Sequence, residues 1–372
     1  MASGDSEQQK MPLLTLALWL IAVRASDLFH FFDEFDVPAA QAGWIATLLA
    51  GVWAGLGTAL AYGLYRSFPG RPLTQVLEER LGRVVGKGIN VVLAWFLLHE
   101  AAISLRSLTD AVESAILSRT PPVAVSAALA LVVVFAARAG IEVIGRSVIP
   151  VTVAMFLAVG LIVVLIMRDV DVARLMPVLG PGWGAIAASS FYIASLSTHL
   201  VLLPVFLGFT ETSRRTGWVL QAQNALVHLF IAANQALVVA AMSFAVSRNK
   251  VFEFLSLARY VSVGEFLERI DPLLLAGWVA TSYAAIAAFF LASLMAAQAA
   301  LGLKDYRPLT CPFGVLLVFL SRILFDNIRE RTAFVGYAEA ANAYRLLFIF
   351  VLPLLLWPLL YWRRRAPARG AP

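Results

Sequence analysis

Ten apolar segments, each close to the length that an α-helix needs to cross a bilayer, dominate this sequence. A bilayer core about 30 Å thick requires about 20 helical residues, with a range of roughly 17–25. Backbone polar groups in lipid must be satisfied within the protein, and the chain lacks the alternating pattern of barrel strands. We therefore expect an all-α polytopic membrane protein. The ten expected spans cover about residues 12–32, 42–65, 88–109, 122–138, 147–167, 184–208, 217–246, 271–302, 309–325 and 340–362.

The composition excludes a water-soluble fold. Hydrophobic residues make up 60% of the chain and charged residues 14%, whereas a soluble domain has about 45–50% and about 25%. The net charge of +6 fits cytoplasmic loops of a membrane protein, and no basic-aromatic patch indicates a nucleic-acid partner. Cys311 is the single cysteine, which excludes an internal disulfide and a cysteine-based metal cluster. We expect one integral membrane domain over residues 1–372, in contact with the lipid bilayer.

The distribution of Lys and Arg predicts the orientation. Ten spans place both termini on one side, and the first residues lack the basic region of a cleaved signal. Sixteen Lys and Arg lie on the side of the termini and 12 near the opposite loops, four of these in the long 247–270 connection. Short loops near span ends set orientation, so we discount that connection. We expect the tails, residues 1–11 and 363–372, to be cytoplasmic.

Two connections show helical amphipathicity of their own. Within residues 68–87, apolar residues form one stripe opposite the charges, which predicts an amphipathic helix on the cytoplasmic interface. That stripe consists of Leu73, Val76, Leu77, Leu81, Val84 and Val85. Residues 251–272 show a similar pattern on the outer side.

Polar side chains interrupt four of the expected spans. An ionisable residue at membrane depth is costly, so each is a candidate functional residue. The candidate ligand-binding residues are Ser26, Asp27 and His30 in the first span, Phe96, His99 and Glu100 in the third, Ser195, Ser197, Thr198 and His199 in the sixth, and Thr281, Ser282 and Tyr283 in the eighth.

A structural role is the alternative for each of these residues. A Ser or Thr in a membrane helix often bonds back to its own turn. His99 and Glu100 are about 100° apart around a helix, so we expect at most one to face a central cavity. The other is then available to a neighbouring helix or to Arg106. Gly51 and Gly55 have the small-xxx-small spacing of packed helices.

Catalytic and metal-binding motifs are absent from the sequence. The four histidines show no His-x-x-x-His or Glu-x-x-His spacing, so we expect no metal site. No P-loop, nucleophile elbow or Gly-rich phosphate motif occurs, so we expect no cofactor and no enzyme activity.

The polar interruptions fall at corresponding places in two halves of the chain. Spans one and six are five helices apart, as are spans three and eight. Transporters built from inverted repeats place discontinuous helices around a midplane substrate site. We therefore expect a five-plus-five inverted repeat, residues 12–167 and 184–362, with discontinuous helices one and six.

Five connecting segments carry a resemblance that runs from about Leu13 to Trp362. They are RSFPGRPLTQVLEERLGRVVGK (66–87), ILSRTPP (116–122), ARAGIEVIGRSVIP (137–150), RLMPVLGPGW (174–183) and SVGEFLERIDPLLLAGWV (262–279). In order and spacing they resemble the B-subunit family of bacterial spore germinant receptors. These are ten-helix spore germination permeases of the amino acid-polyamine-organocation transporter superfamily.

The resemblance implies a location in the spore inner membrane and assembly with A-type and C-type receptor subunits. It also implies recognition of a small nutrient, typically an amino acid, by helices one, three, six and eight. Free N–H groups at broken helices suit a carboxylate. Here Asp27 in helix one, with Arg24 nearby, and Ser197-Thr198-His199 in helix six depart from the family's glycine-containing pattern. Two alternatives to an amino acid therefore stay open. The chain binds a different ligand, or it is a family member that has lost ligand binding.

Three functions are consistent with these features. The first is a B-type germinant-receptor subunit that recognises a nutrient and signals to partner subunits. The second is a stand-alone secondary transporter of an amino acid or similar solute, coupled to protons through Asp27, Glu100 or a histidine. The third is an ion-conducting or structural subunit that binds no nutrient.

Overall fold

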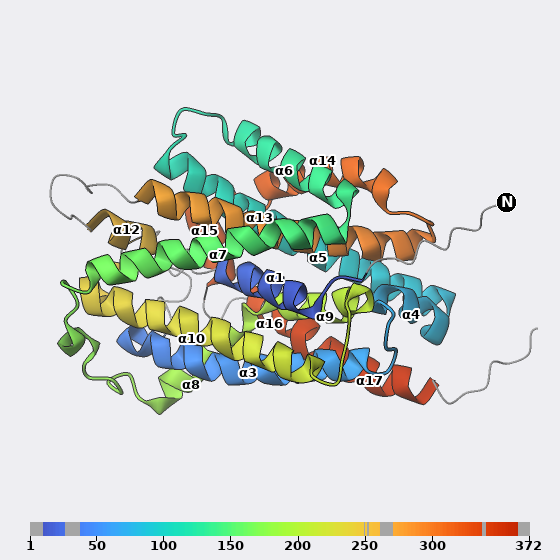
Figure 1. Cartoon of the computed structure of the whole chain (residues 1–372), viewed down its shortest axis with the longest axis horizontal. Helices are drawn as coiled ribbons and strands as arrows, with labels where there is room; N and C mark the ends of the chain where they lie inside the picture. Colours follow the sequence, from blue (N-terminus) through green and yellow to red (C-terminus); the bar gives the residue numbers. More distant parts are fainter. Residues whose placement is uncertain are drawn as a thin grey trace, which may run out of the picture.

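Long apolar helices form a bundle and run along the longest axis of the molecule (Figure 1). The computed structural model describes residues 10–26, 38–248, 250, 253–260, 271–336 and 340–363. In these residues the regular structure is helical, and one isolated bridge joins Met11 to Thr210. The helices are α1 (Leu13–Ala25), η2 (Ala40–Ala42), α3 (Gly43–Tyr65), α4 (Leu73–Leu81), α5 (Arg83–Ala115), α6 (Pro122–Ala139), α7 (Ile141–Ile166), η3 (Val172–Leu175), α8 (Trp183–Ser195), η4 (Thr198–Leu202), α9 (Leu203–Phe206), η5 (Leu207–Phe209), α10 (Thr216–Met242), α11 (Phe244–Ser247), α12 (Glu253–Tyr260), α13 (Asp271–Leu301), η6 (Arg307–Leu309), α14 (Thr310–Ile323), α15 (Ile328–Val335), α16 (Ala340–Leu346), η7 (Leu347–Val351) and α17 (Leu352–Arg363).

Seven helices in the described part of the chain are long and apolar enough to cross a membrane, and the bent pair α8 and η4–η5 makes an eighth if it is one span. The other two expected spans contain the shorter apolar helices α1, with 13 residues, and α14, with 14. The expected all-α membrane fold is confirmed. The count of ten spans and the division into two repeats stay predictions.

The expected amphipathic helix over residues 68–87 is shorter in the structure. α4 ends at Leu81, and Gly82 has a φ of 87°, a backbone conformation that suits glycine because it lacks a Cβ. Val84 and Val85 consequently belong to α5 and are 86% and 54% exposed. In the sequence the stripe of apolar residues continues across Gly82, so the hydrophobic pattern alone does not reveal that the helix ends there. On the other side, α12 covers Glu253–Tyr260, and residues 261–270 lie outside the described residues.

α5 and α13 form the centre of the bundle, where they pack against each other. In the most apolar 18-residue stretch of α13, 83% of the residues are buried, against 33% in the corresponding stretches of α6 and α7. A helix that is apolar all round and buried all round belongs to a core. The exposed apolar residues of the peripheral helices, such as Phe135 and Val164, form the surface that lipid would cover.

One end of the bundle carries the basic connections, and we call it the basic end. Met11, beside the first described residue, pairs through its backbone with Phe209 and Glu211, and α17 finishes at the same end (Figure 1). The loop after α13 is tied down there, since the Tyr306 hydroxyl donates to the carbonyl of Ala137 at 3.0 Å. Burial raises the pKa of this phenol, which keeps its donor proton in place. Both ends of the described chain thus lie on one side, as an even number of spans requires.

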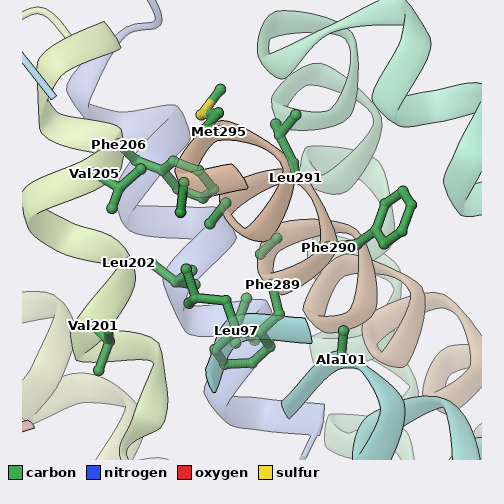
Figure 2. Packing of buried hydrophobic residues seen from close by; sticks show 14 of the residues in the cluster. Leu97, Ala101, Val201, Leu202, Val205, Phe206, Phe289, Phe290, Leu291 and Met295 are labelled. Atoms are coloured by element: carbon green, nitrogen blue, oxygen red, sulfur yellow. The ribbon is translucent and has the colours of Figure 1, made fainter. Parts of the chain in front are cut away.

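Apolar side chains fill the space between the sixth span and its neighbours toward the basic end (Figure 2). Leu202, the last residue of η4, and Phe206 of α9 are fully buried in one apolar cluster with α13 residues such as Phe289 and Met295. The Phe206 ring stacks on Trp19 of α1 with ring centroids 5.1 Å apart. This packing closes the bundle on the basic side of the polar residues in the sixth span.

Candidate ligand site at the break in the sixth span

The sixth expected span is broken near its middle. α8 ends at Ser195, and Ser197 leaves helical geometry with a φ of -78° and a ψ of 43°. The chain restarts as the 3-10 turn η4 at Thr198, and the two halves meet at a bend of 40°. Pro204 at the start of α9 has no backbone N–H to donate to the preceding turn, which favours a break here. The expected discontinuity of helix six is confirmed.

Hydrogen bonds join the break to α16 and α10. The Ser195 hydroxyl lies 2.9 Å from Oδ1 of Asn342 on α16. The Ser197 hydroxyl lies 3.5 Å from Nε2 of His228 on α10, and Nδ1 of the same ring lies 2.9 Å from the carbonyl oxygen of Asn224. If Nδ1 donates to that carbonyl, Nε2 accepts from Ser197. The two hydroxyls therefore have protein partners.

His199 differs from these residues because its hydrogen-bonding capacity is unused. The side chain is 1% exposed, and neither ring nitrogen has a hydrogen-bond partner among the described residues. An unpaired buried polar group costs about 1–3 kcal/mol. The charge of Arg24, fully buried on α1, acts on both His199 and His228. We call the group Arg24, Ser197, Thr198, His199 and His228 the break cluster.

α3 approaches the break cluster closely because of its small residues. A Cβ at Gly51 would lie 3.0 Å from Cβ of His228. The carbonyl oxygens of Gly51 and Gly55 accept from the amides of Asn224 and Gln221, each at 2.9 Å. The small-xxx-small spacing is therefore a helix-packing contact, which brings α10 and its histidine against α3.

Phe96, His99 and Glu100 form a second group, between α5 and α16. Glu100 makes a buried bidentate ion pair with Arg345, at 2.9 and 3.2 Å. The His99 ring meets Tyr344 edge to face with centroids 5.7 Å apart, and the Phe96 ring stacks on Phe348 at 3.9 Å. Both His99 and Glu100 thus contact α16, and Glu100 is paired with a neighbouring helix.

Arg106 pairs with Asp110 on the same helix and not with Glu100. Its Nε donates to Oδ1 of Asp110 at 2.8 Å, and Arg331 of α15 lies 3.5 Å from Oδ2 of the same carboxylate. Arg106 also donates to the carbonyl oxygen of Phe325 at 2.6 Å. This buried network holds the segment after α14 against α5.

The α13 candidates differ from one another in their contacts. The Thr281 hydroxyl bonds back to its own helix, 3.1 Å from the carbonyl oxygens of Gly277 and Trp278. The Tyr283 hydroxyl lies 3.3 Å from that of Ser147 on α7. Ser282 is buried, and its hydroxyl has no partner among the described residues. Of the three, Ser282 alone keeps an unused polar group.

The first-span candidates lie partly outside the described residues. α1 ends at Ala25, and the Ser26 hydroxyl donates to the carbonyl oxygen of Val23 at 2.7 Å. Asp27 and His30 lie outside the described residues, so the expected discontinuity of helix one stays a prediction there. α1 packs against η4, α10 and α13, which places its last turn beside the break cluster.

Arg24, His228, Arg345 and Asn342 belong to these groups and were absent from the expected site residues. Arg24, His228 and Arg345 are ionisable residues within expected spans, so the rule that selected Glu100 applies to all three. Asn342 gives no such signal, because a neutral amide in a membrane helix commonly serves as a packing contact.

A helical bundle with a broken sixth span and buried polar side chains at the break is a membrane-protein fold that solved transporters also have. Mhp1, a nucleobase-cation-symport-1 family transporter solved in a closed conformation with bromovinylhydantoin bound, shares the fold. The TM-score is 0.69 at 12% identity, over 97% of this chain and 81% of that chain. MhsT in complex with L-phenylalanine gives 0.61 at 12% identity, over 94% and 98%.

The family model for spore germination proteins matches residues 31–328, so the chain belongs to the spore germination protein family. Spore germination protein KB of Bacillus subtilis (strain 168) is 23% identical over 348 residues, covering 90% of this chain and 91% of that protein. Spore germination protein YndE of the same strain is 24% identical over 329 residues, covering 87% and 88%. The expected family resemblance is confirmed. This is a family of integral membrane spore germination proteins and not of enzymes.

Proposed function

We propose that this chain is the ligand-recognising B-type subunit of a spore germinant receptor. Its ligand is a small nutrient such as an amino acid, bound at the broken sixth span, and it signals germination through A-type and C-type partner subunits. Membership of the spore germination protein family supports the germination role. The transporter fold supports a small-molecule site at the level of the break.

One observation carries the proposed site: His199 is buried and both of its ring nitrogens lack partners among the described residues. A buried polar group without a partner is costly, and a bound ligand would remove that cost. The break cluster, Ser26 and Ser282 surround the site in this proposal. Asp27 and His30 are included from the sequence.

The α5–α16 group would transmit binding. His99 and Glu100 contact α16, as does Phe96, whose ring lies 5.2 Å from that of Tyr344 between centroids. α16 also carries the Asn342 partner of Ser195. A ligand that displaces the sixth span therefore acts on the α16 contacts of α5. Thr281 and Tyr283 would support the site from α13.

The membrane placement belongs to the same proposal. The chain would lie in the inner membrane of the spore with both termini in the cytoplasm, which makes the basic end the cytoplasmic one. The excess of Lys and Arg there supports this orientation.

A thermal-shift screen of the detergent-purified protein against amino acids and other small nutrients tests the site. A ligand at 100 times its Kd stabilises a protein by about 2.7 kcal/mol. We expect His199→Leu to stay folded and to lose the ligand-induced shift, since the replaced ring makes no hydrogen bond to the described residues.

The matched control is Thr152→Val on α7, because among the described residues that buried hydroxyl bonds only to its own helix, 2.8 Å from the carbonyl oxygen of Val148. It should keep the full shift. A His199→Leu protein with an unchanged ligand response would move the site elsewhere.

The alternative is a stand-alone secondary transporter, proton-coupled through Asp27, Glu100 or a histidine. The fold shared with Mhp1 and MhsT favours it. Uptake of a labelled nutrient by the purified chain alone in liposomes, driven by a proton gradient, would support transport. Binding without uptake, together with co-purification of A-type and C-type subunits, would support the receptor.

A further inference from the structure

A cavity of about 1080 Å³ opens at the basic end, outside the candidate ligand site. It lies between the end of α3, the start of α10 and α17, and both α10 and α17 pack against α3 (Figure 1). The segment 212–214, just before α10, completes its wall. None of the break cluster residues lines it.

The cavity is positively charged. Arg66 at the end of α3 and Arg214 before α10 both line it, and no Asp or Glu is among the described residues of its wall. Neither guanidinium has an ion pair within the described part of the chain. Hydroxyl groups, including that of Ser213, add further hydrogen-bond donors. Two guanidinium groups without an acidic partner in this wall, with neutral donors around them, suit the binding of an anion.

Aromatic side chains of two membrane helices also line the cavity. Trp218 of α10 is 81% exposed, and Trp357 and Tyr361 of α17 are 38% and 44% exposed. A Cβ at Gly63 of α3 would lie 3.0 Å from the Trp357 ring, so this glycine lets the ring lie against the helix. Trp and Tyr with one exposed side gather at the level of lipid headgroups. The cavity therefore borders the headgroup layer of the bilayer.

We propose that this cavity binds the phosphate group of an anionic phospholipid from the leaflet at the basic end. The planar guanidinium groups of Arg66 and Arg214 each present paired N–H donors that match two phosphate oxygens. Basic pockets between membrane helices are known to hold anionic headgroups. The volume exceeds the needs of a lone phosphate and accommodates a headgroup with its glycerol. A lipid seated there joins α3 to α10 and stabilises their contact.

Thermal shift with short-chain lipids tests this site on the full-length protein in detergent. Dioctanoyl phosphatidylglycerol should raise the Tm in a concentration-dependent manner, and dioctanoyl phosphatidylcholine, with the same chains and no net charge, should not. The double variant Arg66→Gln/Arg214→Gln should raise the half-maximal phosphatidylglycerol concentration at least tenfold. Both side chains belong to exposed residues, so the variant should remain folded and monodisperse.

Arg215→Gln is the matched control, because Arg215 is exposed beside Arg214 and does not line the cavity. It should respond like the unchanged protein. Native mass spectrometry supplies a second readout, the number of phosphatidylglycerol molecules retained, which should fall by one in the double variant.

Two results would overturn the assignment. A phosphatidylglycerol response that is equal in the double variant would show that the arginines hold no headgroup. A shift of the same size from soluble glycerol phosphate, with the same dependence on Arg66 and Arg214, would assign the cavity to a soluble phosphate compound instead of a lipid.

Discussion

At the scale of single residues, the buried charges of α5 are matched by charges from the last third of the chain. Glu100 pairs with Arg345, and Asp110 lies between Arg106 and Arg331. A charge taken out of water is retained only when it is paired and hydrogen-bonded. Arg345 holds the Glu100 carboxylate at both oxygens, so the first role that we assign to Glu100 is a structural contact, and a role as a proton site comes second.

Removing one partner of the Glu100–Arg345 pair should therefore destabilise the protein. We expect Glu100→Gln and Arg345→Gln each to lower the free energy of unfolding by about 3–5 kcal/mol, because a buried charge loses its counter-ion. The double variant should cost less than the sum of the two single changes, which a double-mutant cycle of thermal unfolding in detergent measures.

Glu113→Gln on the same helix is the control, since Glu113 makes no ion pair among the described residues. It should change stability by less than about 0.5 kcal/mol. A stable Glu100→Gln protein that loses nutrient response or uptake would instead identify Glu100 as a functional proton or ligand site.

At the scale of elements, glycines determine where helices turn and how closely they pack. α4 folds back against the first turns of α5 because Gly82 adopts a positive φ and Gly86 has no side chain. A Cβ at Gly86 would lie 2.4 Å from Cα of Glu78 and 2.5 Å from the carbonyl oxygen of Leu77. Backbone atoms cannot move aside as a flexible side chain can.

Gly86→Ala should consequently separate α4 from α5 and lower stability by about 1–3 kcal/mol through overpacking. Gly88→Ala is the matched control two residues further along α5, where nothing lies within 4 Å of a new Cβ. That change should be neutral or stabilising by up to about 1 kcal/mol, because alanine favours a helix over glycine. Equal Tm values for the two variants would contradict the tight α4–α5 contact.

At the scale of the whole molecule, the two ends of the described chain lie at the basic end. Topology reporters fused after Arg215 and after Arg365 should both read cytoplasmic, and a reporter after Arg119 should not. The physical basis is the excess of Lys and Arg in the short loops of that side. An external reading after Arg365 would overturn both the ten-span count and the proposed orientation.

The sequence alone was sufficient for the membrane environment, the all-α architecture and the polar break near Ser197. These follow from one-dimensional quantities, since the length of an apolar run and the cost of a polar group in lipid need no knowledge of neighbours. The family resemblance also rested on segments of the sequence, and the family match confirms it.

The tertiary structure decided which polar groups are paired and which are not. Arg345 lies 245 positions from Glu100 in the sequence, and no local pattern joins them. His199 and Ser195 appear equivalent in the sequence, yet Ser195 contacts Asn342 whereas His199 has no hydrogen-bond partner among the described residues. Pairing between distant helices depends on which faces the packing brings together. That packing is a property of the whole bundle, and the periodicity of any single span does not contain it.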